Sequence, residues 1–250
     1  MIPKIIHFIW LGPRKKNRLI KKCMHSWRKL HPNWEIVEWN NQHFHFNECT
    51  FVKMAYKDKN WAYLSDYYRL NTLNLHGGIY LDTDMLVIKP LDKLLNNSFF
   101  CGYETENMLS CGIIGAEKGH NFTQNILNYY NLLDTANWHK ESIPRIFTKV
   151  YSGVEKDDIK IYPIDYFYPY PAESRLNEIN INYKKYITPN TMAIHMWEYS
   201  WSFYSRYQLF LKDKLFMKAL LSFVKEAFTE SKTFKWKEFS KTLFILLGKQ

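Results

Sequence analysis

The stretch Trp61–Pro90, WAYLSDYYRLNTLNLHGGIYLDTDMLVIKP, constrains the fold of this 250-residue chain more than any other segment. Its first half has the pattern of a helix and its second half that of a strand, with Gly77 at the joint. From residue 60 to residue 81, the only side chains fully charged at neutral pH are Asp66 and Arg69. A helix and a strand this apolar are buried on most sides, which favours the centre of an α/β domain.

The two charges of the predicted helix fall on one stripe of a 3.6-residue repeat. Asp66 and Arg69 are three residues apart and can pair, which lowers the free-energy penalty of burying them. A purely structural ion pair is therefore one explanation. Buried pairs stabilise a fold little compared with apolar side chains in their place, so the pair also points to function.

Asp82 and Asp84 stand at the far end of the predicted strand. Strand alternation directs both carboxylates to the same face, where they repel unless a cation lies between them. Mg²⁺ and Mn²⁺ bind one or two carboxylates together with substrate phosphates. Ligands of open α/β sheets gather at the carboxyl ends of strands. The pattern predicts a Mn²⁺ or Mg²⁺ site that holds a diphosphate.

The segment from Ser65 to Asp84 resembles the signature of a known family. It is similar to the DXD-containing sugar transferases of glycosyltransferase family 32, which include yeast α-mannosyltransferases and bacterial capsule and lipooligosaccharide enzymes. It also resembles the catalytic domain of the large clostridial glucosylating toxins. The similarity extends to Ile2–Gly12, Ser26–Ile36 and Ala193–Trp201, and ends before the C-terminal tail.

The resemblance implies a GT-A fold, with an α/β, Rossmann-like sheet that binds a nucleotide-diphosphate sugar. It implies a catalytic set of Asp66, Arg69, Asp82 and Asp84. The implied donor-binding residues are Trp10, Ser65, Asp66, Arg69, Tyr80, Asp82, Ser200 and Trp201. The implied metal ligands are Asp82, Asp84 and His195, with Mn²⁺ or Mg²⁺ as cofactor. An ordinary histidine satisfied within a strand is an equally good explanation of His195.

The resemblance also implies transfer of a hexose with retention of the anomeric configuration, to a saccharide acceptor in surface polysaccharide or lipooligosaccharide synthesis. A UDP-sugar is the favoured donor, and GDP-mannose is the alternative. Double displacement needs a carboxylate nucleophile, and none is evident, so a front-face displacement is favoured. Met108–Gly115 resembles the segment that faces the acceptor. The aromatic loop Tyr166–Tyr170 is either an acceptor platform or a packed loop.

Two other functional classes fit parts of the sequence. The Asp pair could serve a metal-dependent nucleotide-sugar phosphohydrolase. The net charge of +10 and the many aromatic residues suggest nucleic-acid binding, but no such motif is present, and the carboxylate cluster would repel phosphate without a metal. We therefore expect no nucleic-acid partner. Substituting Asp84 separates the metal-dependent functions from any other.

The remaining segments predict one domain, residues 1–204, followed by a basic amphipathic helical tail, residues 205–250. The tail either packs on the domain or on a second subunit, or contacts an anionic membrane that carries a lipid-linked acceptor. No secretory signal, transmembrane run or paired-cysteine motif is evident, which predicts a cytoplasmic protein, free or held at the inner membrane face. Further strands are expected at 4–11, 34–39, 79–88, 99–104, 111–116, 159–162 and 192–197, and further helices at 14–30, 51–56, 120–133 and 142–150.

Overall fold

The computed structural model describes residues 1–13, 15–139, 141–172 and 182–198. The chain divides into two compact units. The first comprises Met1–Pro171 and Tyr183–Met196, and the second comprises Ala172–Asn182 and Trp197–Gln250. The predicted tail, residues 205–250, lies outside the described residues.

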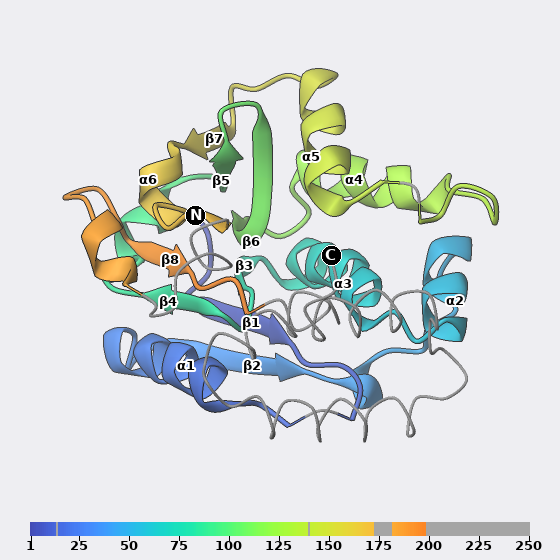
Figure 1. Cartoon of the computed structure of the whole chain (residues 1–250). Helices are drawn as coiled ribbons and strands as arrows, with labels where there is room; N and C mark the ends of the chain where they lie inside the picture. Colours follow the sequence, from blue (N-terminus) through green and yellow to red (C-terminus); the bar gives the residue numbers. More distant parts are fainter. Residues whose placement is uncertain (14, 140, 173–181, 199–250) are drawn as a thin grey trace, which may run out of the picture. The chain divides into compact units, whose positions relative to one another are not determined.

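A six-stranded mixed sheet forms the centre of the first unit (Figure 1). Its order is β2-β1-β3-β6-β5-β7. β1 runs parallel to both β2 and β3, β6 is antiparallel to β3 and β5, and β7 is parallel to β5. This arrangement confirms the predicted α/β class and its opening parallel pair. The strands are β1 (Ile5–Ile9), β2 (Glu35–Trp39), β3 (Gly78–Leu81), β5 (Phe99–Thr105), β6 (Met108–Ala116) and β7 (Ile159–Tyr162).

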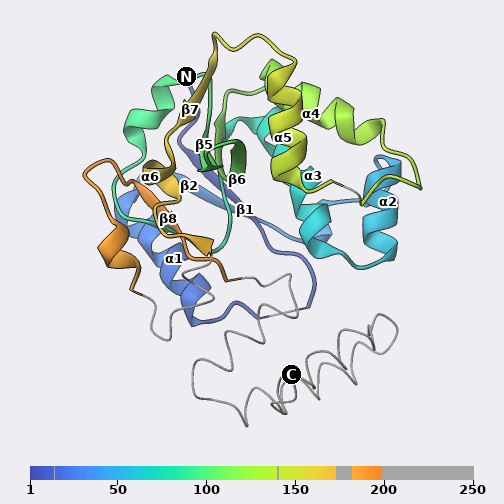
Figure 2. The ribbon, with the colours of Figure 1, turned by 45° about the horizontal axis from the view of Figure 1, so that its top comes forward.

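The first five α-helices follow the predicted segments closely, whereas the short sixth helix falls where the sequence predicted an aromatic loop (Figure 2). Within the described residues, none is long and apolar enough to cross a bilayer. The α-helices are α1 (Arg18–Leu30), α2 (Thr50–Lys57), α3 (Trp61–His76), α4 (Asn121–Asn131), α5 (Ile143–Ser152) and α6 (Ile164–Phe167). The 3-10 turns are η1 (Asn41–His43), η2 (Asp92–Asn96) and η3 (Tyr183–Tyr186).

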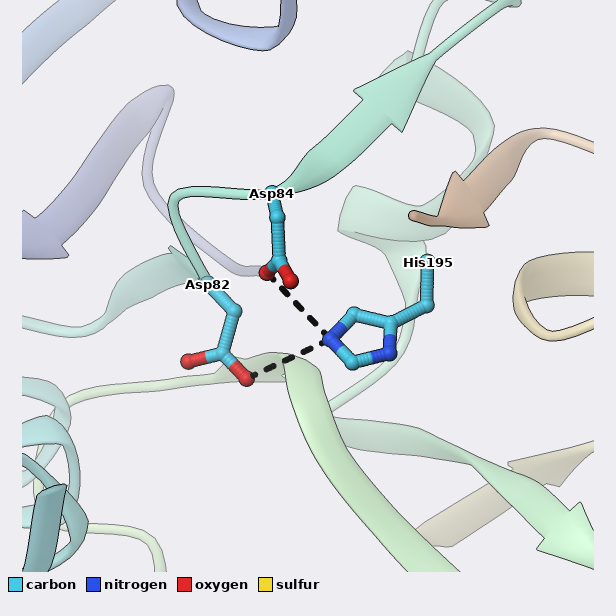
Figure 3. A group of neighbouring side chains, drawn as sticks. All are labelled: Asp82, Asp84 and His195. Atoms are coloured by element: carbon cyan, nitrogen blue, oxygen red, sulfur yellow. Dashed lines mark ion pairs between the residues drawn. The ribbon is translucent and has the colours of Figure 1, made fainter. Parts of the chain in front are cut away.

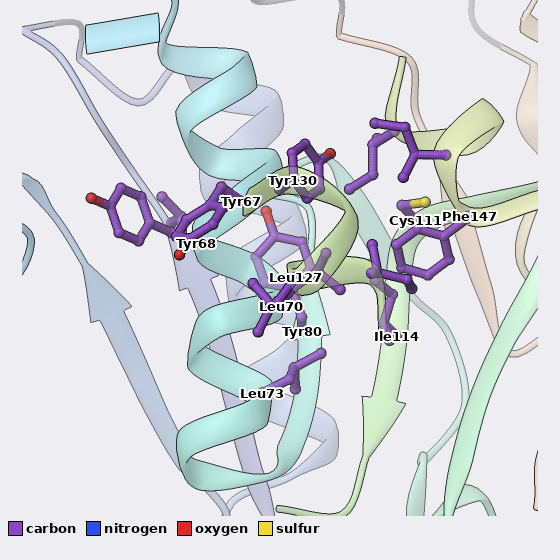
Figure 4. Packing of buried hydrophobic residues seen from close by; sticks show 14 of the residues in the cluster. Tyr67, Tyr68, Leu70, Leu73, Tyr80, Cys111, Ile114, Leu127, Tyr130 and Phe147 are labelled. Atoms are coloured by element: carbon purple, nitrogen blue, oxygen red, sulfur yellow. The ribbon is translucent and has the colours of Figure 1, made fainter. Parts of the chain in front are cut away.

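Helix α3 has the ends that its sequence predicts. The Asn60 side chain accepts a hydrogen bond from the Tyr63 amide, and Gly77 ends the helix at a φ of 67°. The helix packs between the sheet and α4, in a core of aliphatic and aromatic side chains (Figure 4). Its central position follows from being apolar on nearly every face. Core residues around α3 include Leu70, Leu73, Tyr80, Ile114, Leu127, Tyr130 and Phe147.

The predicted single strand over residues 79–88 is wrong. The chain forms β3, turns at Asp82–Asp84, and continues as β4 (Met85–Val87), which pairs antiparallel with β8 (Ala193–His195) in a separate two-stranded sheet. The Met85 amide donates to the Asp82 carbonyl at 2.9 Å, which closes the turn. Aspartate favours turns over strands. Strand alternation therefore does not place the two carboxylates; the turn does.

The predicted loop between the two following strands is also too long. β5 and β6 extend to residues 105 and 108 and join directly through Glu106 and Asn107. Cross-strand pairing continues through Thr105 and Met108, with register shifts along the ladder. A two-residue connection suffices for an antiparallel hairpin, so residues expected in the loop belong to strand β6.

Helix α1 is fastened to β4 by two hydrogen bonds. The buried Trp27 indole donates to the Met85 carbonyl at 2.7 Å, and the Ser26 hydroxyl accepts from the Val87 amide at 3.1 Å. These bonds satisfy backbone groups of β4 on the side away from β8. The helix thus supports the strand that follows Asp84.

His7 on β1 is a buried neutral histidine. Its Nδ1 accepts from the Trp39 indole at 3.1 Å, so Nε2 carries the proton and donates to the Gly77 carbonyl at 2.8 Å. Burial lowers the pKa of His7 from 6.5 to about 4, against the opposing effect of the Gly77 bond. Between the two pKa values, the unfolded chain therefore takes up a second proton on His7 more readily than the folded protein does.

The stability of the fold is expected to fall as the pH drops from 6.5 towards 4. His7 contributes fully above its unfolded pKa, and the contribution, about 2 to 3 kcal/mol, is lost on acidification towards its folded pKa. His7→Gln should flatten this part of the curve, whereas His45→Gln, at an exposed position, should not. Urea unfolding at several pH values measures the difference. Equal slopes for wild type and His7→Gln would contradict the assignment.

Candidate metal and donor site

Asp82, Asp84 and His195 converge where β3 gives way to β4 (Figure 3). The His195 Nε2 atom lies 3.3 Å from Asp84 Oδ1 and 4.0 Å from Asp82 Oδ2. One ligand atom from each residue lies within 4.8 Å of the others. The β4–β8 register pairs Met85 with His195, and this pairing carries the histidine to the turn from more than one hundred residues away in sequence.

The three side chains form a donor set that fits a divalent cation. Carboxylate oxygens with one imidazole nitrogen suit Mn²⁺, and two carboxylates supply the negative charge. Burial lowers the pKa of His195, but Asp84, through charge and a hydrogen bond, and Asp82 outweigh it, so the pKa is raised. The carboxylates thus impose a field that favours positive charge at this position.

Gly112 on β6 keeps space beside the same cluster. A Cβ atom at this position would lie 2.9 Å from the Tyr168 hydroxyl, 3.0 Å from Asp82 Oδ2 and 3.5 Å from His195 Cδ2. The Gly112 carbonyl accepts from the Asp82 amide at 2.7 Å. The absence of a side chain thus lets β6 approach the Asp82–Asp84 turn closely.

Gly112→Ala is expected to weaken Mn²⁺ binding and sugar-donor turnover about tenfold or more. The added methyl group crowds Asp82, and displacement of about 1 Å at a reacting centre can reduce rates about a hundredfold. Calorimetric Mn²⁺ titration and donor turnover measure the change. Gly153→Ala is the control, because its Cβ would have no neighbour closer than 3.7 Å. Unchanged Mn²⁺ affinity in Gly112→Ala would count against a cation beside Gly112.

Arg69 links three elements behind the cluster. Its guanidinium donates to Asp66 Oδ1 at 2.7 Å and to the Cys111 carbonyl at 2.7 Å, and lies 3.3 Å from Asp82 Oδ1. Further bonds of 3.3 Å reach the carbonyl and hydroxyl of Ser65. The predicted Asp66–Arg69 pair is confirmed. In this arrangement the arginine positions both carboxylates; direct contact with a donor stays a prediction.

Asp66 is a buried carboxylate behind the cluster, with a side chain that is 13% exposed. Burial raises its pKa, Arg69 lowers it, Asp82 raises it further, and the result is about 7. The ion pair therefore does not fully offset desolvation.

Tyr80 completes the positioning of Asp82. Its hydroxyl donates to Asp82 Oδ1 at 2.9 Å, and its ring lies 4.7 Å from Arg69 Cζ. The cation over the ring and the hydroxyl on the carboxylate make Tyr80 a bridge between the two charged groups. Tyr80 was predicted as a donor-binding residue, and the structure brings it to the Asp82 carboxylate.

Tyr168 belongs to the predicted aromatic loop Tyr166–Tyr170, but the sequence patterns did not place it beside the cluster. Its buried hydroxyl accepts from the Gly112 and Ile113 amides at 3.0 and 3.2 Å, and its ring centroid lies 5.6 Å from that of His195. The burial of Phe167, Tyr168 and Tyr170 supports a packed loop rather than an acceptor platform. The glycine within an apolar strand was an available signal of this close approach.

The remaining predicted site residues lie elsewhere or outside the described part. Trp10 follows the end of β1, next to β3 in the sheet, and its ring lies 5.2 Å from Lys16 Nζ. Parallel neighbours end at one edge of the sheet, so Trp10 stays a candidate for the base pocket. Ser200 and Trp201 lie outside the described residues, and their predicted donor contacts stay predictions.

Comparison with known proteins gives a family match to the central segment. Residues 17–100 match the family described as "Glycosyltransferase sugar-binding region containing DXD motif". The matched region runs from the start of α1 to β5 and contains Asp66, Arg69, Asp82 and Asp84. It excludes Gly112 and His195, which the fold adds to the site.

Two curated proteins are similar over about half of this chain. "Uncharacterized glycosyltransferase L373" of Acanthamoeba polyphaga mimivirus is 32% identical, over 48% of this chain and 52% of its own length. Lactosylceramide 4-alpha-galactosyltransferase of Mus musculus is 30% identical, over 54% of this chain and 40% of its own length. The chain spans about half the length of these relatives or less.

One solved structure, "PaToxG Glycosyltransferase", shares the fold. It superposes with a TM-score of 0.50 and 16% identity, over 61% of this chain and 70% of that chain. At this identity the likeness concerns the fold alone. It confirms the predicted GT-A type of α/β arrangement.

Proposed function

We propose that this chain, which belongs to the DXD-containing glycosyltransferases, transfers a hexose from a nucleotide-diphosphate sugar to a saccharide carried on a lipid. The observation that carries the proposal is the convergence of Asp82, Asp84 and His195 beside the buried Asp66–Arg69 pair. Two carboxylates and an imidazole form a cation site, and Asp66 supplies a hydrogen-bond acceptor next to it. A donor diphosphate and its sugar need both features.

Each residue has a distinct part in this proposal. Asp82, Asp84 and His195 would hold a divalent ion, which offsets the charge that develops on the departing diphosphate. Arg69 and Tyr80 keep Asp82 in place from behind. Asp66, fixed by Arg69, accepts hydrogen bonds from sugar hydroxyls. Trp10, Ser200 and Trp201 are our candidates for contacts with the base and the phosphates.

We further propose that the transfer retains the anomeric configuration. A covalent mechanism needs a free carboxylate near the anomeric carbon. Asp66 is engaged by Arg69, and Asp82 by Arg69 and Tyr80. This engagement favours front-face displacement, in which the departing phosphate assists the incoming hydroxyl. The name of the mouse relative specifies an α linkage, which is consistent with retention from an α-linked donor.

The acceptor class is inferred from the same relative, whose name gives a glycosylated ceramide as its substrate. We propose a lipid-linked saccharide as the acceptor here and a UDP-hexose as the donor. A GDP-hexose is the alternative donor. A thermal-shift panel of UDP- and GDP-sugars with Mn²⁺ separates them, because a ligand of the folded state raises the apparent stability.

The test is transfer by the full chain to a lactosyl lipid, with Mn²⁺ and the donor selected by thermal shift. The expected product is an α-linked glycoside, identified by its anomeric proton coupling in NMR. A β-linked product from an α-donor would refute retention. Release of sugar 1-phosphate and nucleoside monophosphate at the same rate with and without acceptor would instead favour a metal-dependent nucleotide-sugar phosphohydrolase.

A further inference from the structure

The surface of helix α1 is basic along its whole exposed side. All its exposed residues are Arg, Lys or His: Arg18, Lys21, Lys22, His25, Arg28 and Lys29. Its opposite face, with Ile20, Cys23, Met24 and Trp27, is buried. The first 34 residues of the chain contain nine Lys or Arg and no Asp or Glu. Within the described residues, no carboxylate pairs with an α1 side chain.

A second segment extends this surface from the far end of the sequence. The Lys22 ammonium donates to the Tyr183 hydroxyl at 3.2 Å and lies 5.2 Å from the centre of the Tyr183 ring. This contact joins η3, which carries the exposed Lys184 and Lys185, to α1. Both ribbon views place the turn beside the helix (Figure 2). The joined surface, defined as α1 with residues 183–187, is called the basic face below.

The basic face also carries apolar and interfacial side chains. Ile187 is 40% exposed at the end of η3. Tyr183 and Tyr186 are partly exposed, and Lys185 Nζ lies 4.9 Å from the Tyr186 ring. Tyrosine with lysine and an exposed aliphatic tip is typical of protein surfaces that rest in the headgroup region of a bilayer.

We propose that the basic face of α1 and η3 binds an anionic phospholipid surface. The proposal rests on the proposed function, in which the acceptor saccharide is carried on a lipid. Anionic headgroups attract basic residues near the surface by about 1 kcal/mol each. A second copy of this chain is a poor occupant, because it would oppose one basic face with another. The phosphates of a nucleic acid would pair with the basic side chains, but they would leave Ile187 without an apolar partner.

The helix that carries the basic face also contacts the strand next to the site. The Trp27 indole on the buried side of α1 donates to the Met85 carbonyl, one residue after Asp84. A membrane bound to the exposed side would therefore anchor the element that supports the Asp84 turn. Lipid binding brings the enzyme to the surface where its acceptor is concentrated, without any contact between lipid and the Asp82–Asp84–His195 cluster.

The test is co-sedimentation of the full chain with vesicles of phosphatidylglycerol and phosphatidylcholine, compared with phosphatidylcholine alone. Binding is expected only to the anionic vesicles and should weaken with salt. The variant R18Q/K21Q/R28Q/K29Q should bind at least about a hundredfold more weakly, because each lost charge accounts for about fivefold. Ile187→Ser should weaken binding severalfold.

The matched control is K53Q/K57Q/K93Q/K118Q, which removes the same charge from exposed positions elsewhere. It should retain most of the vesicle binding. Equal losses in both variants, or no loss in the α1 variant, would overturn the proposal. The proposal would also be overturned if binding of a labelled single-stranded RNA depended on the α1 lysines and vesicle binding did not.

Transfer assays separate this proposal from the proposed function. The α1 variant should keep its turnover with a soluble saccharide acceptor and lose turnover with the same saccharide on vesicle lipid. If neither acceptor is glycosylated while vesicle binding behaves as expected, the proposed function is refuted and the lipid-binding proposal is supported. If both are glycosylated equally by wild type and variant, the surface proposal fails and the function stands.

Discussion

Replacing Asp84 by Asn is expected to lower sugar transfer by about a hundredfold or more, with little change in folding. The substitution keeps the shape of the side chain and removes the charge of a proposed metal ligand. A bound metal stabilises the charge that develops on the leaving diphosphate by several kcal/mol. Mn²⁺ affinity should fall in parallel. Steady-state transfer and calorimetric Mn²⁺ titration measure the two effects.

Asp92→Asn is the matched control for this variant. Asp92 lies on the surface, 3.4 Å from Lys4, away from the cluster. Its substitution should leave both Mn²⁺ affinity and transfer unchanged. Transfer that survived Asp84→Asn in the presence of Mn²⁺ would refute a metal-held diphosphate at this site.

Replacing Arg69 by Met is expected to have the largest effect on stability, a loss of about 3 to 5 kcal/mol. The change leaves Asp66 buried without its partner and removes a neighbour of Asp82. Removing one member of a buried pair strands the other charge in a poorly solvating interior. Urea unfolding at pH 8, where Asp66 of the wild-type protein is largely ionised, gives the change in free energy.

The double variant Arg69→Met/Asp66→Asn separates charge burial from lost packing. Removing the stranded carboxylate should restore part of the stability, giving a coupling energy of about 1 to 3 kcal/mol in a double-mutant cycle. Transfer should not recover, because Asp82 still lacks the guanidinium. A loss below about 1 kcal/mol in Arg69→Met would show that the pair is not an important part of the core.

The sequence predicted α3 and its chemistry because the signals are local. Helix periodicity placed Asp66 and Arg69 on one stripe, and Asn60 and Gly77 marked the ends of the helix. The family resemblance added His195, which the β4–β8 pairing brings to the Asp82–Asp84 turn. These features depend on spacing within one helix or on a motif, and both can be recognised in the amino-acid sequence.

Features that depend on tertiary pairing were not predictable in the same way. Strand alternation gave a continuous strand through Asp82 and Asp84, whereas pairing of β4 with β8 divides it. The Tyr168 hydroxyl meets Gly112 only because α6 packs on β5 and brings the tyrosine to β6. Local patterns contain no information about which distant backbone amide a hydroxyl reaches.

The distribution of charge along the sequence contains a signal for the basic face. The C-terminal tail was the predicted basic segment, and residues 202–250 carry a net charge of +6. The first 34 residues, with nine basic and no acidic residues, are more strongly basic. The helical period of α1 sorts these charges onto one side, and the fold joins them to η3.

We expect Asp82, Asp84 and His195 together to hold the divalent ion that binds the donor diphosphate. A crystal of the protein grown with Mn²⁺ and UDP, measured at the manganese absorption edge, tests it directly. One anomalous peak is expected, in contact with all three side chains and with the diphosphate oxygens. A manganese peak elsewhere, with the diphosphate bound away from Asp84, would contradict it.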